Sequence, residues 1–148
     1  MRFFLGWAQE VAGDHAAAQE SWRKALSELE PFLKEQPENL SLIADLALTN
    51  ACLGDKAAAF KLADRAMTTV PIEKDAVFGP GALEALALVA AQTGEPDRAI
   101  AAIQKLLSIP GGTPLTPALL RLDPMFDPLQ NDPRFQKLAS TAPETADK

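Results

Sequence analysis

His15 and Cys52 are the one histidine and the one cysteine of this chain, and both residue types can take part in nucleophilic or acid–base chemistry. A nucleophile needs a base within hydrogen-bond reach, and the spacing places no such partner beside either residue. His15 follows Gly13-Asp14 at the start of a predicted helix, where we expect it to face solvent. Cys52 lies between Ala51 and Leu53 and is predicted to be a small apolar filler. The sequence therefore predicts no catalytic residues and no enzyme.

Three carboxylates near the C-terminus, Asp123, Asp127 and Asp132, suggest a metal site at first sight. Each one directly precedes a proline. Asp-Pro is typical of a helix N-cap followed by the first helical position, where proline loses no hydrogen bond. The spacing also lacks the alternating ligands and central glycine of a calcium loop. We therefore predict that these residues start short helical turns, and we predict no metal site and no cofactor.

The elements that must carry any function come from a pattern that occurs three times: an apolar helical run, Gly with an acidic residue, and a second run rich in Ala. The copies are LGWAQEVAGDHAAAQESWRKAL, LALTNACLGDKAAAFKLADRAM and LALVAAQTGEPDRAIAAIQKLL. Their turn glycines, Gly13, Gly54 and Gly94, are separated by 41 and 40 residues. Self-similarity at such a period indicates a stacked solenoid of helix pairs.

Apolar periodicity predicts six helices, separated in each copy by the Gly-acidic turn. Gly can adopt the left-handed conformation that ends one helix, and Asp can cap the next. Pro31 either kinks the second helix or splits it. Buried alanines are expected where helices cross, with Trp22, Phe60, Ile103 and Leu106 filling the space between pairs. The predicted ranges are 2–12, 15–36, 39–53, 56–69, 80–93 and 96–108.

Composition restricts the class of partner. Apolar residues reach 47%, and the net charge is -6. An acidic chain opposes binding to nucleic acid or to an anionic membrane, since phosphate contacts need clustered Lys and Arg. The sequence shows no secretory leader and no apolar run long enough to span a membrane. We expect a cytoplasmic protein, and because the repeat pattern begins almost at Met1, a piece of a longer chain.

Residues 1–110 resemble the tetratricopeptide repeat family, whose pattern includes W-x2-L-G-x2-Y followed by A-x3-F. The matching positions hold Leu5-Gly6, Leu46-Ala47 and Leu86-Ala87 in the first helices, and Ala18, Ala59 and Ala99 in the second. The Tyr position holds Gln9, Asn50 and Ala90, and the period exceeds the family's 34 residues, which leaves a HEAT-like solenoid as the alternative. The resemblance implies an all-α fold, an α-solenoid of three antiparallel helix pairs at about 1–37, 38–74 and 75–110.

Residues 111–139 are predicted to form a short helical C-terminal cap, followed by a mobile tail at 140–148. The cap is expected to cover the apolar end of the last repeat. Its sequence LTPALLRLDPMFDPLQNDPRFQKL resembles the closing segment of bacterial multidomain regulators that carry tetratricopeptide repeats. That resemblance implies a sensory or scaffolding module. The apolar residues expected to cover the end are Leu119, Leu122, Met125, Phe126, Leu129, Phe135 and Leu138.

The resemblance also implies a concave binding surface on the first helix of each pair. The family's clamp for anionic C-termini needs Lys, Arg and Asn. The matching neighbourhood here holds Phe4, Asp45 and Ala85. We therefore expect a ligand that carries a basic residue beside apolar anchor residues. The function predicted is a non-catalytic protein–protein interaction scaffold. Two alternatives stay open: packing of Phe3 and Trp7 against a further N-terminal repeat, and self-association through that face. The predicted partner-binding residues are Phe3, Trp7, Glu10, Ala44, Leu48, Cys52, Glu84, Leu88 and Gln92.

Overall fold

The computed structural model describes residues 2–71, 73–75, 77–109 and 115–140, and these residues form helices and no strand. The first six helices begin and end within one residue of the predicted ranges. Pro31 lies inside the second helix, which continues through it. The elements are α1 (Arg2–Val11), α2 (His15–Glu35), α3 (Leu40–Cys52), α4 (Lys56–Thr69), α5 (Gly79–Gln92), α6 (Pro96–Leu107), α7 (Pro117–Leu122), the 3₁₀ helix η1 (Pro124–Leu129) and α8 (Pro133–Ser140).

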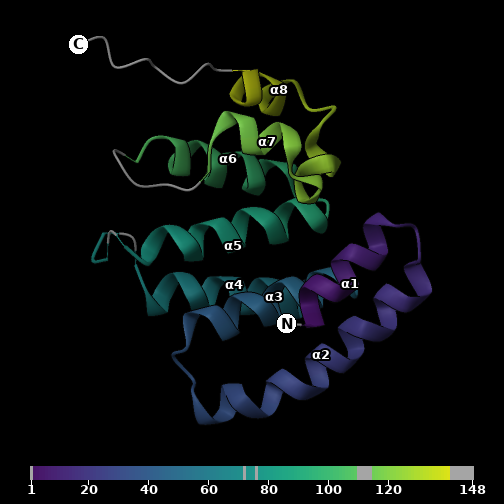
Figure 1. Ribbon diagram of the computed structural model, residues 1–148. Helices are drawn as coiled ribbons and strands as arrows, with labels where there is room; N and C mark the ends of the chain where they lie inside the picture. Colours follow the sequence, from purple (N-terminus) through teal and green to yellow (C-terminus); the bar gives the residue numbers. More distant parts are fainter. Residues whose placement is uncertain (1, 72, 76, 110–114, 141–148) are drawn as a thin grey trace.

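The Gly-acidic turns have the predicted geometry. Gly13, Gly54 and Gly94 have φ angles of 86°, 84° and 75°, a region that residues with a Cβ rarely adopt. The carboxylate of Asp14 accepts a hydrogen bond from Ala17 N at 3.1 Å, and Asp55 repeats this bond with Ala58 N at 3.0 Å. In the third turn no side chain caps the helix, and Pro96 occupies its first position. These turns reverse the chain between the helices of each pair (Figure 1).

From α1 to α6, consecutive helices pack against one another (Figure 1). α1 contacts α2, α3 contacts α4 and α5 contacts α6, while α2–α3, α4–α5 and α3–α5 contacts join one pair to the next. Small residues are buried where the backbones approach, as predicted, and Trp22, Phe60, Ile103 and Leu106 are buried among them. The alanines concerned are Ala18, Ala25, Ala59, Ala66, Ala87 and Ala99, each at most 1% exposed.

The C-terminal segment covers α5 and α6, with η1 against α5 and α8 against α6. Met125, Phe126, Leu129 and Phe135 are buried in the same core as residues of α1–α6. These residues of the predicted cap therefore share one core with the first six helices. Residues 110–114 and 141–148 lie outside the described part, and Ser140, predicted to begin a tail, is the last residue of α8.

Two predictions about this segment are wrong. Leu119 and Leu122 are exposed, at 45% and 77%, whereas Leu120 is fully buried. Successive helical residues are rotated by about 100°, so when Leu120 faces the core its neighbours on α7 point elsewhere. Asp127 does not start a helical turn, because it lies inside η1. Asp123 and Asp132 do accept hydrogen bonds from the following turn, from Met125 N and Arg134 N, both at 2.9 Å.

None of the described helices is both long enough and apolar enough to cross a membrane.

Candidate functional site: an acidic face between α1, α5 and η1

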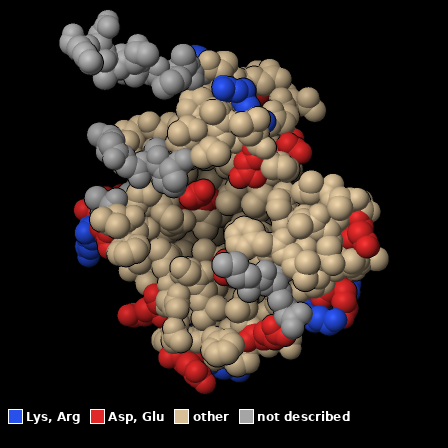
Figure 2. Space-filling view, in the orientation of Figure 1, with Lys and Arg blue, Asp and Glu red and all other residues tan. Residues whose placement is uncertain are grey.

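The candidate site lies on the face formed by the first helix of each pair. α3 packs between α1 and α5, and η1 packs against α5, so that α1 and η1 stand on either side of α5's C-terminal end. The side chain of Gln92, at the end of α5, donates from Nε2 to the carbonyl oxygen of Met125 at 2.7 Å. This hydrogen bond attaches η1 to α5. The face is hollowed near its centre (Figure 2).

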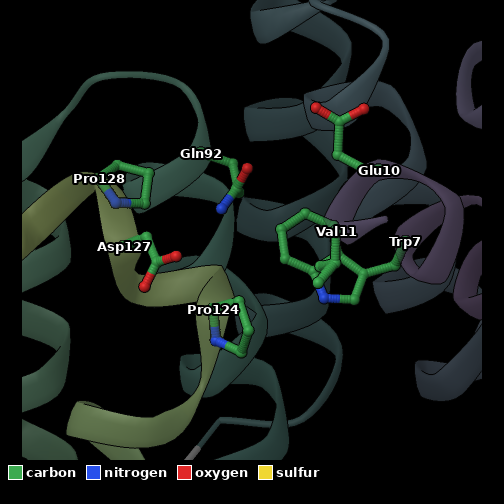
Figure 3. Close-up of a pocket in the computed structure, with 7 residues that line it drawn as sticks. All are labelled: Trp7, Glu10, Val11, Gln92, Pro124, Asp127 and Pro128. Atoms are coloured by element: carbon green, nitrogen blue, oxygen red, sulfur yellow. The ribbon is translucent and has the colours of Figure 1, made fainter. Parts of the chain in front are cut away.

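A cavity of about 360 Å³ lies between α1 and η1. Trp7, Glu10 and Val11 form the α1 wall, and Pro124, Asp127 and Pro128 form the η1 wall. Figure 3 shows the Trp7 indole extending from α1 toward Pro124, with Gln92 between the two walls and the Glu10 and Asp127 carboxylates on opposite sides. The cavity therefore combines an aromatic ring, two proline rings and two carboxylates.

A second cavity, of about 280 Å³, lies where α3 and α5 begin. Its lining is mostly apolar and includes Leu40 and Ala44 of α3 and Pro80 of α5. Val77 and Phe78, just before α5, also line it and are strongly exposed, at 78% and 61%. Ala44 and Gln92 therefore lie at opposite ends of one face, each beside a cavity.

The charged side chains described on this face are acidic. The helices α3, α5 and η1 contain no Lys or Arg, and their charged residues are Asp45, Glu84 and Asp127. α1 adds Glu10 near its C-terminal end, while its one basic residue, Arg2, is the first residue, about 12 Å away along the axis. Figure 2 shows carboxylates around the hollow and the basic side chains toward the edges of the view.

This environment raises the pKa of three groups. Burial, and next the charge of Asp123, raise the pKa of the Glu84 carboxyl above its usual range. Burial also raises the pKa of the Asp45 carboxyl. Burial, and next the charge of Glu10, raise the pKa of the Cys52 thiol to about 12. Each shift disfavours the negative form, and a cation close to any of these groups would lower its pKa again.

Basic side chains of the second helices form ion pairs between helix pairs. Arg98 of α6 lies 3.2 Å from Asp64 of α4, with its guanidinium 4.1 Å from the centre of the Phe60 ring. Lys56 pairs with Glu95, and Arg134 of α8 lies 2.7 Å from Asp97. These pairs engage basic side chains of α4, α6 and α8. The carboxylates of α3, α5 and η1 have no basic residue on their own helices.

The structure brings together some of the predicted partner-binding residues. Trp7, Glu10 and Gln92 line one cavity, and Ala44 lines the other. Glu84 and Cys52 are half-buried, and the charge of Glu10 acts on the Cys52 thiol. Leu48 and Leu88 are 8% and 9% exposed, so their part in binding stays a prediction.

Phe3 is not brought to this surface. Its side chain is 2% exposed in the core, and its carbonyl oxygen accepts a hydrogen bond from Trp22 Nε1 at 3.2 Å. Phe3 therefore offers no side-chain surface to a partner or to a further repeat. The adjacent Phe4, 57% exposed, is the aromatic residue that α1 presents to solvent.

Sequence reasoning did not identify the η1 wall. The sequence predicts residues 124–128 only as part of the cap, because nothing local indicates that the chain returns to α1. The signal that was available is compositional: α3, α5 and η1 share an absence of basic residues. The sequence also gives no sign that Val77 and Phe78, in the loop before α5, line the apolar cavity.

His15 and Cys52 lie in different surroundings, His15 beside a carboxylate and Cys52 half-buried. His15 Nδ1 lies 2.9 Å from Glu10 Oε1, and the His15 side chain is 71% exposed. A thiol with a pKa near 12 is almost entirely protonated at neutral pH and is a poor nucleophile. Among the described residues, no group of three His, Cys, Asp or Glu side chains is placed to hold a metal ion.

In comparisons with known proteins, no family model, no curated protein and no solved structure matches this chain.

Proposed function

We propose that the chain is a non-catalytic, tetratricopeptide-like α-solenoid that binds a peptide or helix of another protein along the face of α3 and α5. The Gly-acidic turns, the repeat period and the contacts between successive helix pairs support this proposal. The resemblance of the C-terminal segment supports the wider proposal that the chain is a module of a larger bacterial regulatory protein in the cytoplasm.

The observation that carries the proposal is the pair of cavities at the two ends of one face. α5 runs from Pro80, beside the apolar cavity, to Gln92, beside the cavity of Trp7. Twelve helical residues span about 18 Å. An extended segment of about five or six residues, or a helix of about twelve, covers that distance. Leu48, Glu84 and Leu88 lie on the stretch of α3 and α5 between the two ends.

The negative charge of this face indicates which residues a bound segment should contain. Glu10, Glu84 and Asp127 are negative, and two of them are at the cavity of Trp7. A segment with apolar side chains for the first cavity and at least one basic residue for the second would be complementary to this face. An anionic segment would be repelled, which also disfavours nucleic acid.

The proposal is tested by selecting binders from a random-peptide display library on the immobilised chain and measuring their affinities by calorimetry. Selected peptides are expected to combine apolar with basic residues. Ala44→Arg should weaken them at least tenfold, since the new side chain occupies the apolar cavity. Ala57→Arg, on the exposed start of α4, is the matched control and should leave affinity unchanged. Thermal melting checks that both variants fold. Selected peptides that bind Ala44→Arg and the parent chain equally would contradict the assignment.

Self-association is a second candidate, favoured by the exposed apolar side chains of α1. Phe4, Leu5 and Val11 are 57%, 50% and 59% exposed. Two copies could bury these residues against each other. Light scattering over a hundredfold range of concentration decides this point, because a mass that stays at the monomer value throughout excludes it. If the mass rises, Leu5→Glu should return it to the monomer value.

A further inference from the structure

The cavity between α1 and η1 has walls suited to one long cationic side chain. We propose that it binds an arginine side chain of the partner segment. This inference rests on the proposed function and deepens it, because it assigns one residue of the partner to one place on the chain. The volume of about 360 Å³ is near the lower end of the range of small-molecule pockets, which is enough for a side chain.

The apolar parts of the walls would contact the methylene groups and the flat face of the guanidinium. Trp7 and Val11 lie on one side, and Pro124 and Pro128 on the other. Arg stacks on an indole face through its planar, weakly hydrated head, and Trp is the aromatic residue that binds cations best. Lys has no planar head, so the same walls favour Arg over Lys.

The charged parts of the walls would meet the head of the side chain. Glu10 and Asp127 lie on opposite walls, and none of the lining residues that the structure describes is basic. One Glu10 oxygen already lies 2.9 Å from His15 Nδ1, and the second oxygen is available for a guanidinium N–H. Five donors in a fixed plane allow one guanidinium to contact carboxylates on two sides, which an ammonium does less well.

Gln92 gives the cavity a fixed polar edge. Because its Nε2 donates to Met125 O at 2.7 Å, the orientation of the amide is set and Oε1 is left as the acceptor. Figure 3 shows this side chain between the two walls. A guanidinium that enters the cavity can therefore donate to an amide oxygen as well as to the two carboxylates.

The test uses the two tryptophans as reporters in ¹H–¹⁵N spectra of the full chain. Trp7 lines the cavity, whereas Trp22 is 2% exposed and hydrogen-bonded to Phe3. The probe is N-acetylarginine amide, titrated to about 50 mM at constant ionic strength. The Trp7 indole resonance, assigned with Trp7→Phe, should shift saturably while that of Trp22 stays in place. The neutral isostere N-acetylcitrulline amide should give no saturable shift, and N-acetyllysine amide, with its ε-ammonium free, should bind at least threefold more weakly.

Variants separate the cavity from general electrostatic attraction. Asp127→Asn and Glu10→Gln should each weaken the arginine probe about 3- to 10-fold, because each removes one charged acceptor. Glu20→Gln, an exposed residue of α2, removes the same charge elsewhere and should change nothing. Any of four results would overturn the assignment. The first two are the lack of a saturable shift with the arginine probe and equal shifts with the citrulline probe. The other two are equally tight binding of the arginine and lysine probes, and binding of the arginine probe by Asp127→Asn as tight as by the parent. If display peptides bind normally in that case, the proposed function stands and only the arginine site is lost.

Discussion

The Cα of Gly6 in α1 lies against the indole ring of Trp22 in α2. A Cβ at Gly6 would lie 2.6 Å from Cδ1 of Trp22 and closer still to Nε1. The ring cannot move aside easily, because it is buried and its Nε1 donates to Phe3 O. The approach of the two helices at this point therefore requires a residue without a side chain.

Gly6→Ala should destabilise the chain by about 1–3 kcal/mol through overpacking, despite the better helix propensity of Ala. Gly81→Ala is the matched control, since Gly81 also lies in a helix and a Cβ there meets nothing within 4 Å. It should be neutral or stabilise by up to about 1 kcal/mol. Urea unfolding of both variants measures the two changes. Equal effects would show that the contact with Trp22 does not constrain α1.

Glu84→Gln should stabilise the chain at neutral pH. Burial and the charge of Asp123 raise the pKa of Glu84 in the folded chain, so the folded state binds this proton more tightly than the unfolded state. The contribution of the group to stability is therefore fully present below its unfolded pKa, about 4.3, and is lost as pH rises through the folded pKa. The free energy of unfolding of Glu84→Gln, relative to the parent, should be larger at pH 7 than at pH 4. The stability change caused by Glu20→Gln should depend much less on pH. If Glu84→Gln changed the free energy of unfolding by the same amount at pH 4 and pH 7, the pKa of Glu84 would not be raised.

Cys52 should react slowly with thiol reagents in the folded chain. With its pKa near 12, the thiolate fraction at neutral pH is roughly a thousandfold below that of an ordinary cysteine. Ellman's reagent should therefore react far faster after unfolding in urea. Glu10→Gln should speed the reaction of the folded chain, because it removes the second cause of the raised pKa, and Glu20→Gln should not. A reaction as fast in the folded as in the unfolded chain would disprove the shift.

Phe135 should be necessary for the stability of the whole domain. Its ring is fully buried and lies 6.0 Å from that of Phe126, measured between centroids. Phe135→Ala should cost about 3–5 kcal/mol of unfolding free energy, whereas Leu122→Ala, on the exposed face of α7, should cost less than about 0.5 kcal/mol. Because the C-terminal segment shares the core of α1–α6, we expect one cooperative transition in each variant. Two transitions for Phe135→Ala, with α1–α6 unfolding at the parent's midpoint, would mean that the segment is a separate unit.

The helices and turns were predictable because their causes are local. Gly54 and Asp55 end one helix and cap the next within a few residues. The helical spacing of the apolar residues sets which side of each helix is buried. The position of η1 was not predictable in this way. It depends on packing against α5 and on the hydrogen bond from Gln92 to Met125, between residues that are distant in sequence.

The same difference between local and long-range causes applies to the candidate site. The resemblance to tetratricopeptide repeats predicts Trp7, Glu10 and Gln92 on one surface, because it implies that the first helix of each pair lines that surface. Asp127 belongs to a wall that only the folded chain creates. Phe3 was misplaced for a related reason. Its helical position resembles that of Trp7, but the close approach of α1 to Trp22 turns it into the core.

The walls of the cavity come from opposite ends of the chain, and their separation is set indirectly. α1 packs mainly against α2 and also contacts α3, whereas η1 packs against α5. The width between Trp7 and Asp127 therefore depends on the angle at which α3 and α4 pack against α5. A small rotation at that packing interface would change the width by an amount that grows with the distance from the interface. A ligand held by both walls would resist the rotation, and binding at this cavity would therefore make the domain stiffer against bending.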